Sequence, residues 1–276
     1  MNGRPVDDRL LDFLRRKIRQ AFDLRGAIAM ARQAGYSDGA IDAGIERVRP
    51  RGSSLIAGRI PALFLVRRAP ANLRNLGAPQ LDLYALDGFL EPRECEQLIA
   101  LVSGNLQPSG LSHGNDPEFR ISQSALLCFL DDPLATAIDA KICRTLGVSA
   151  EYSEGIQAQR YDAGGLFKPH FDYFGAGSDV HRSACSVRGN RTWTFMVYLN
   201  EDFTGGATRF TEIDCVVRPR TGMALFWNNL SADGTPNPLT KHCGEIVTGG
   251  HKVIITKWFR LLGDGPLFVE LPISGG

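Results

Sequence analysis

Residues 164–173 read GGLFKPHFDY and place His170 two positions before Asp172. The stretch from Leu166 to Phe171 predicts a β-strand, and side chains two apart on a strand project from the same face. The imidazole of His170 and the carboxylate of Asp172 can therefore converge on one cation. Two ligands make half a metal site, so the third has to come from elsewhere in the chain.

His242, 72 residues after His170, is the best candidate for the third ligand. It would complete a face of two histidines and one carboxylate, which leaves coordination positions open and suits non-heme Fe(II) and oxygen chemistry. A His-x-Asp pair alone is a short motif that often arises by chance, and the alternative is an ordinary surface pair on a strand. The interpretation therefore depends on the rest of the sequence.

The composition is that of a globular protein with room for one sizeable domain and a small accessory one, at 276 residues and 30.2 kDa. With 30 Gly and 15 Pro, many turns and a β-rich body are expected. Residues 1–80 carry 15 Lys/Arg against 7 Asp/Glu, and the remaining 196 carry 16 against 23. Such asymmetry fits a nucleic-acid or acidic-partner surface, but a solvated basic helix face is more common. Nucleic acid is thus not expected as a partner.

The cysteines show neither a Cys-x-x-Cys pair nor the dense spacing of a disulfide framework, which fits a reducing compartment. The N-terminal stretch MNGRPVDDRLLDFLRRKIRQ lacks the apolar core of a signal peptide, and no run approaches 18 apolar residues. We therefore expect a cytoplasmic protein without a membrane span. The six cysteines are Cys95, Cys128, Cys143, Cys185, Cys215 and Cys243.

Residues 1–78 are predicted to be a helical N-terminal segment and linker, followed by the main domain over 79–276. Apolar residues at three-to-four spacing predict an amphipathic helix over 7–24, and a second helix follows over 26–33. Ser37 can cap a third helix that runs to about Val48. A docking or homodimerisation role is one hypothesis for this segment, and simple packing against the main domain is the other.

The main domain is predicted to be mainly β with bracing helices. A strand within 81–90 precedes a helix that Pro92 starts, and a strand over 122–129 precedes a helix over 133–146. After Gly147 the pattern is almost wholly β, with turns at glycine pairs, which suggests a sandwich or jelly roll. The eight expected strands cover 155–161, 166–171, 192–200, 207–210, 215–217, 223–227, 243–247 and 252–261.

The two-residue period also sorts the faces of these strands. In 192–200 the odd-numbered residues form the more apolar face, expected to pack outward against helices, and Thr194, Met196 and Tyr198 form the other. Gln157, Gln159 and Tyr161 similarly share a face of their strand, which suggests a lined pocket or else a solvent-facing surface. Lys252 opens the apolar strand KVIITKWF. A lysine inside a barrel requires an anion, such as a carboxylate cosubstrate, whereas at a strand end it can simply face water.

Taken in order, these motifs resemble the prolyl 4-hydroxylase branch of the Fe(II)/2-oxoglutarate dioxygenases over roughly residues 84–261. The resemblance implies a double-stranded β-helix, or jelly-roll core, with iron near its open end. It implies that His170, Asp172 and His242 are the iron ligands of the catalytic centre and that Lys252 pairs with the distal carboxylate of 2-oxoglutarate. The motifs are IQAQRY (156–161), GG (164–165), HFD (170–172), GGAT (205–208), FWN (226–228) and KHCG (241–244), with Gly249, Lys252 and Trp258.

By the same resemblance, Tyr161, Tyr198 and Thr208 line the cosubstrate pocket. Arg191 lies where the family often has an arginine that faces the substrate, with fastening of the adjacent loop as the alternative role. His181 and His251 are further histidines that could ligate a metal, but we expect them to be structural. The Gly/Ser-rich stretch FGAGSDVHRSACSVRGN (174–190) is expected to be a loop of the kind that forms an active-site lid.

The implied activity is hydroxylation of an unactivated C–H bond with Fe(II), 2-oxoglutarate and O2, yielding succinate and carbon dioxide, with ascorbate as a further candidate cofactor. Because Asp172 is present, hydroxylation is favoured over halogenation. The leading substrate is a prolyl residue in a peptide or protein, and a free amino acid or natural-product intermediate is the alternative. A noncatalytic partner-binding protein that senses 2-oxoglutarate or iron is a hypothesis from another class. A zinc hydrolase is weaker, because it would leave Lys252 without a role.

Overall fold

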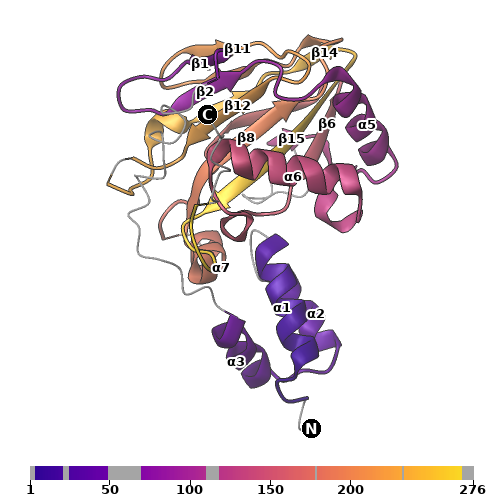
Figure 1. The fold of residues 1–276 in the computed structure, drawn as a ribbon, viewed down its shortest axis with the longest axis vertical. Coiled ribbons are helices and arrows are strands. Elements are labelled where there is room, and N and C mark those ends of the chain that lie inside the picture. Colours follow the sequence, from indigo (N-terminus) through magenta and orange to yellow (C-terminus); the bar gives the residue numbers. More distant parts are fainter. Residues whose placement is uncertain are drawn as a thin grey trace, which may run out of the picture.

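A computed structural model describes residues 4–20, 25–48, 70–109, 118–177, 179–231 and 233–268. The expected linker up to residue 69 and the last turn of the first predicted helix, 21–24, lie outside these ranges. The main body is a β-structure with helices packed on one side, and the N-terminal helices form a separate small group beside it (Figure 1). The helices are α1 (Asp8–Gln20), α2 (Arg25–Gln33), α3 (Asp38–Val48), α5 (Pro92–Ser103), α6 (Pro133–Leu146) and α7 (Asp179–Arg188), with single-turn 3₁₀ helices η2 (Leu127–Phe129), η3 (Ala150–Tyr152) and η4 (Pro238–Thr240).

Two antiparallel sheets form the double-stranded β-helix. The larger has the strand order β1-β2-β12-β8-β15-β6-β5-β3 and the smaller β11-β10-β13-β7-β4, and β14 and β9 pair separately. Strands distant in sequence thus become neighbours, as β8 and β15 do. The strands are β1 (Leu73–Asn75), β2 (Leu83–Leu86), β3 (Gln107–Pro108), β4 (Arg120–Ile121), β5 (Gln123–Leu126), β6 (Gln157–Asp162), β7 (Leu166–His170), β8 (Arg191–Tyr198), β9 (Thr204–Gly205), β10 (Thr208–Phe210), β11 (Cys215–Val217), β12 (Ala224–Asn228), β13 (His242–Gly244), β14 (Val247–Gly249) and β15 (His251–Arg260).

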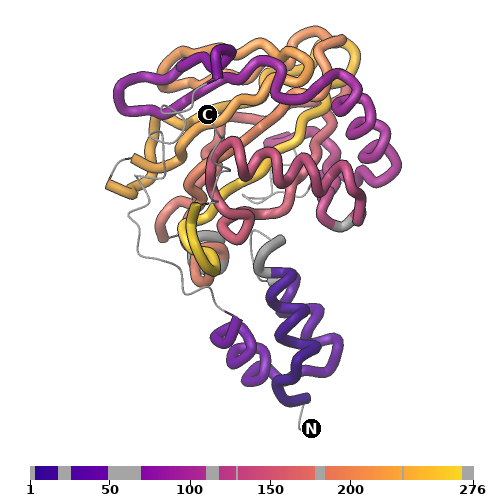
Figure 2. Tube along the Cα trace, viewed as in Figure 1, coloured from indigo at the N-terminus to yellow at the C-terminus, as the bar shows by residue number. Residues whose placement is uncertain are grey.

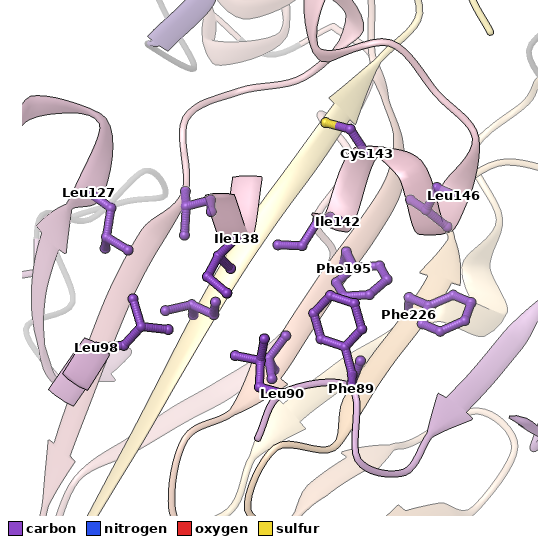
Figure 3. Packing of buried hydrophobic residues seen from close by; sticks show 14 of the residues in the cluster. Phe89, Leu90, Leu98, Leu127, Ile138, Ile142, Cys143, Leu146, Phe195 and Phe226 are labelled. Atoms are coloured by element: carbon purple, nitrogen blue, oxygen red, sulfur yellow. The ribbon is translucent and has the colours of Figure 1, made fainter. Parts of the chain in front are cut away.

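The two faces of β8 separate two hydrophobic cores, as its alternation predicted. Phe195 and its odd-numbered neighbours pack against α5 and α6, in a core that includes Leu98 and Ile138 (Figure 3). Met196 and Tyr198 instead enter the core that lies between the sheets. One face of the larger sheet is therefore covered by helices, and the other faces the smaller sheet and the space where a ligand can bind.

Local signals set the ends of α6. The Asp132 side chain accepts hydrogen bonds from the backbone N–H groups of Leu134 and Ala135, Pro133 occupies the first turn, and Gly147 ends the helix with φ of 71°. Asp132 is the N-cap and Pro133 the early proline expected at the start of a helix, and Gly147 is the left-handed residue expected at its end. The helix therefore spans the residues expected from the sequence.

The N-terminal helices enclose a small core of their own. Leu10 and Leu14 of α1 pack with Ile41 of α3, and the Ser37 hydroxyl accepts a hydrogen bond from the Ala40 N–H, as expected for a cap. Val187 of α7 belongs to the same cluster, so this unit packs against the main body through α7. The Cα trace shows the indigo N-terminal helices beside the α7 region (Figure 2).

Two expectations about local structure are wrong. The stretch 174–190 is not a continuous loop, because it contains α7, whose Ala184, Val187 and Arg188 are buried. Arg188 donates to the carbonyls of Ser153 and Glu151, which ties the end of this helix to the main body. The single strand expected over 243–247 is instead two, β13 and β14, since the chain leaves the smaller sheet after Gly244 to pair with β9.

Candidate metal centre

His170, Asp172 and His242 come together in the described part of the chain. One potential ligand atom from each lies within 4.8 Å of the others, and all three side chains are nearly buried. His170 ends β7 and His242 begins β13, and these residues are direct partners in the register of the two strands. Strand pairing thus places the second imidazole opposite the first, with Asp172 two residues further along.

Both histidines present the Nε2 atom to the centre. The Nδ1 atom of His170 lies 2.8 Å from the Lys168 carbonyl oxygen, and that of His242 lies 2.9 Å from the Thr240 carbonyl oxygen. A carbonyl only accepts, so Nδ1 carries the proton in each ring and the Nε2 lone pair is free. The two Nε2 atoms lie 3.8 Å and 4.0 Å from the carboxylate oxygens of Asp172. This is the tautomer that a metal-binding histidine requires.

The electrostatics of the centre keep these groups in their ligating forms. Burial, with a contribution from His242, lowers the pKa of His170 to about 3, which keeps its imidazole neutral. Burial acts to raise the pKa of Asp172, but the neighbouring histidines, Arg191 and a hydrogen bond from Thr194 outweigh it, and the pKa lies below its usual value. A carboxylate between two imidazoles that turn Nε2 toward the centre is the donor set expected for a divalent cation.

A buried lysine lines the same cavity as the three candidate ligands. Lys252 is 3% exposed, and its Nζ donates to the Gly206 carbonyl at 2.7 Å. Burial lowers the pKa of Lys252 to about 8. An ammonium group has three N–H donors, and this one leaves donors free for an anion. The cavity is lined by Arg120, Gln159, Tyr161, Phe167, His170, Asp172, Met196, Thr208, Trp227, His242, Gly244, Lys252, Ile254, Thr256 and Trp258.

Comparison with known proteins agrees with this arrangement. Residues 156–260, which contain the three candidate ligands and Lys252, match the model of the 2OG-Fe(II) oxygenase superfamily. This segment is a 2OG-Fe(II) oxygenase domain. The oxygenase domain is similar to prolyl 4-hydroxylases, and its residues fit Fe(II) and 2-oxoglutarate: two histidines and a carboxylate for the metal, and a buried ammonium in the same cavity for the carboxylate of the cosubstrate.

Among relatives, the rat prolyl 4-hydroxylase subunit alpha-1 is 34% identical over 53% of this chain and 27% of its own length. A putative prolyl 4-hydroxylase of Acanthamoeba polyphaga mimivirus is 28% identical over 67% of this chain and 77% of its own. The chain thus spans about a quarter of the length of the animal subunits it matches. The viral collagen prolyl hydroxylase of Paramecium bursaria Chlorella virus-1, solved with 2OG, shares the fold, with a TM-score of 0.54 and 24% identity over 65% of this chain and 96% of that one.

The structure places the expected cosubstrate residues of the oxygenase domain around Lys252, although their roles stay predictions. The lysine Nζ lies 5.6 Å from the Tyr161 ring centre and 5.4 Å from that of Tyr198. Tyr161 and Thr208 line the cavity. The Tyr198 hydroxyl is fully buried and donates to the Thr208 hydroxyl at 2.7 Å, so it holds a lining residue in place.

Arg191 lies beside the centre in contact with protein groups. Its guanidinium makes a two-pronged pair with Glu154, at 2.9 Å and 2.8 Å, and donates to the Asp172 carbonyl at 3.3 Å. It also stacks on Trp258, 3.9 Å from the ring centre. These contacts agree with the alternative in which Arg191 fastens the loop after Asp172, and contact with substrate stays a prediction. His251 begins β15 outside the ligand cluster, and the side chain of His181 is outside the described structure.

Sequence reasoning assigned no role to several side chains that the oxygenase domain brings to the centre, although Trp227 belongs to one of the motifs quoted above. Arg120, from β4, lies over Phe167, whose ring stacks on His170. Trp227 packs edge-on against His242, with ring centres 4.8 Å apart. Arg120 lies 50 residues before His170, in the stretch FRISQSALL (119–127), which resembles the family's pattern but does not by itself point to the centre. Asn229 lies in a loop and carries no local signal.

Proposed function

We propose that this protein is an Fe(II)- and 2-oxoglutarate-dependent dioxygenase that hydroxylates a prolyl residue of a peptide or protein. The observation that carries the proposal is the convergence of His170, Asp172 and His242 on one side of a buried cavity that also contains Lys252. The similarity to prolyl 4-hydroxylases over residues of the same domain supports proline as the target.

We assign a separate role to each group of side chains in the cavity. His170, Asp172 and His242 would hold the iron, which with 2-oxoglutarate and O2 supplies the oxidising power for hydroxylation of a C–H bond. Lys252 would bind the distal carboxylate of 2-oxoglutarate, with its charge kept by the anion it binds. The apolar walls that Met196 and Ile254 contribute exclude water from the reacting groups.

Two unsatisfied donors in the cavity wall support a substrate rich in acceptors. The Arg120 Nη2 and the Trp258 Nε1 are buried and meet no acceptor within the described structure. A buried donor without an acceptor costs about 1–3 kcal/mol, so a ligand that supplies carbonyl oxygens would be favoured. The backbone of a peptide presents such oxygens on both sides of a prolyl residue, whereas free proline offers only its carboxylate.

The test is succinate formation by the anaerobically iron-loaded protein, with 2-oxoglutarate and O2. Proline-rich peptides should stimulate turnover above the basal rate, matched peptides with alanine in place of proline should not, and the Asp172→Ala variant should form no succinate. Basal turnover that only free L-proline or a small molecule stimulates would reject the peptide substrate. No turnover by protein that binds iron would reject the enzyme and favour a sensing role. Ascorbate belongs in the same assay, where it should prolong turnover.

We also infer two domains, a helical N-terminal segment with its linker over 1–78 and the oxygenase domain over 79–276. The packing of α1 and α3 around their own small core supports the first unit. β1, at 73–75, falls within the inferred linker but pairs with β2, so the end of this linker joins the larger sheet. Homodimerisation through the N-terminal helices would appear as a doubled mass in light scattering.

A cytoplasmic setting is the inference from cysteines that are all unpaired. Among the described helices, none has the length and apolar character needed to cross a bilayer.

A further inference from the structure

A chain of three hydrogen bonds ends on the carboxylate of Asp172. The Trp227 Nε1 donates to the Asn229 Oδ1 at 3.0 Å, the Asn229 Nδ2 donates to the Thr194 Oγ1 at 2.9 Å, and the Thr194 hydroxyl donates to the Asp172 Oδ2 at 2.7 Å. Thr194 and Asn229 are completely buried and Trp227 is 1% exposed. The groups therefore depend on one another for partners, because water does not reach them.

The direction of this chain follows from its first member. An indole N–H can only donate, so the Asn229 side chain must turn its oxygen toward Trp227 and its NH2 group toward Thr194. The Thr194 oxygen then accepts from Asn229, which leaves its own hydrogen for Asp172. Each of the three groups donates to an acceptor in this arrangement, and reversing any member would leave a buried donor of the chain unpaired.

Donation to Oδ2 has a consequence for metal binding. Both carboxylate oxygens of Asp172 lie near a histidine Nε2, but Oδ2, 4.0 Å from that of His242, already accepts from Thr194. Oδ1, 3.8 Å from the His170 Nε2, is therefore the oxygen that keeps its lone pairs for a metal. The ring of Trp227 also packs against His242. Trp227 therefore contacts His242 directly. It is linked to Asp172 through the side chains of Asn229 and Thr194.

We propose that Trp227, Asn229 and Thr194 are positioning residues that hold Asp172 in the orientation for metal binding through one oxygen. The inference rests on the proposed metal site. Partners of this kind, which orient a ligand without touching the metal, typically contribute 10- to 100-fold in metal affinity. Their role differs from core filling because it depends on the hydroxyl hydrogen of Thr194 and not on the volume of the side chain.

The chain offers a matched control for this distinction. Thr192 lies two residues before Thr194 on the same strand and is equally buried, but its Oγ1 has no hydrogen-bond partner among the described residues. A Thr→Val substitution keeps the shape of the side chain and removes the hydroxyl. Thr194→Val therefore removes the hydrogen bond to Asp172, and Thr192→Val removes a hydroxyl of similar burial that makes no such bond.

The experiment is a titration of the full-length apoprotein with Co²⁺, an air-stable substitute for Fe²⁺, followed by the visible absorption of the bound ion. Thr194→Val should weaken Co²⁺ binding by about 10- to 100-fold, Thr194→Ser should restore it to within about threefold, and Thr192→Val should leave it unchanged. Asn229→Leu, which removes the donor to Thr194, should weaken binding less than Thr194→Val does. Circular dichroism and the melting temperature of each apoprotein test whether the fold is intact.

Equal Co²⁺ affinity in Thr194→Val and wild type would overturn the proposal, as would an equal loss in Thr192→Val. If Thr194→Val fails to fold, Thr194→Ser and Asn229→Asp still test it. The serine should bind Co²⁺ as wild type does, and the aspartate, which would draw the Thr194 hydroxyl hydrogen away from Asp172, should bind it more weakly. If Thr194→Val binds Co²⁺ more weakly but the wild-type protein forms no succinate, this inference is retained and the proposed function is rejected. If Thr194→Val binds Co²⁺ as the wild type does and the wild type hydroxylates peptides, the proposed function is retained and this inference is rejected.

Discussion

Replacing Glu154 with glutamine should destabilise the protein because this carboxylate neutralises two buried arginines. Glu154 is 3% exposed and accepts hydrogen bonds from Arg191 on both oxygens and from the Arg260 Nη1 at 2.8 Å. Arg260 is 1% exposed and also donates to the Gly189 carbonyl. Glu154→Gln keeps the size of the side chain but removes the carboxylate charge that faces both guanidinium groups.

The magnitude follows from the ionisation of Glu154. Burial alone would raise its pKa, but the charges and hydrogen bonds of Arg191 and Arg260 prevail and lower the pKa from 4.5 to about 2. At about 1.4 kcal/mol per pKa unit, the ionised form contributes about 3 kcal/mol to the free energy of unfolding. This is close to the roughly 3–5 kcal/mol measured when a buried ion pair loses one partner.

The pH dependence has a definite sign. Since the folded pKa is depressed, the stabilisation is complete above the unfolded pKa of about 4.5 and is lost as the pH falls toward 2. The difference between wild type and Glu154→Gln should be about 3 kcal/mol at pH 7 and about 2 kcal/mol at pH 3.5, since a protonated Glu154 in the unfolded wild type removes part of the advantage.

Urea unfolding at both pH values, followed by circular dichroism, measures these free energies. Glu96→Gln, an exposed glutamate of α5, is the control and should change stability by less than about 0.5 kcal/mol. The reasoning is refuted if Glu154→Gln loses less than about 1 kcal/mol at pH 7, or if its deficit is larger at pH 3.5 than at pH 7.

Three further predictions follow from single contacts. The Kd for 2-oxoglutarate, measured by calorimetry, should rise about tenfold between pH 7 and pH 9, because the free protein loses the Lys252 proton near pH 8. The Kd of Lys252→Arg should not change with pH over this range, and parallel pH profiles of the two proteins would contradict the prediction. Gly222→Ala should lower the unfolding free energy by at least about 2 kcal/mol more than Gly88→Ala. Both glycines have positive φ, but of the two only Gly222 would bring a Cβ against a backbone oxygen, that of Leu90 at 2.0 Å. Equal losses in urea unfolding would contradict this. Asp132→Ala should lower the unfolding free energy by about 1 kcal/mol through loss of the α6 cap, and no measurable loss would show that the two backbone N–H groups find water instead.

Elements with local signals could be predicted closely. The bounds of α6 depend on Asp132, Pro133 and Gly147, all within or next to the helix, and β11 spans the three residues expected. The β13 and β14 region was expected as one strand over 243–247. Which neighbour each half pairs with is a long-range matter that alternation does not encode.

The candidate site divides in the same way. The spacing of His170 and Asp172 on a strand indicated two ligands, and the residue type and family motif indicated His242. Only the pairing of β13 with β7 places His242 opposite His170. The residues alone left Lys252 either inside the barrel or at a strand end in water, and the family resemblance favoured the interior. Its contact with the Gly206 carbonyl, 46 residues earlier in the chain, comes from the fold.

By itself the sequence determined the bounds of elements such as α6 and β11, the separation of the two faces of β8 and the residue types of the candidate metal ligands, because these depend on local periods, caps and spacings. The tertiary structure alone decided that Arg191 pairs with Glu154, that Asn229 joins Trp227 to Thr194, and that the stretch after Asp172 forms a helix packed on the N-terminal unit. The physical reason is that a buried polar group needs a hydrogen-bond partner, and the fold decides which residue supplies it. Arg191 and Glu154 lie 37 residues apart in the chain, and Asn229 and Thr194 lie 35 apart, beyond the reach of any local pattern.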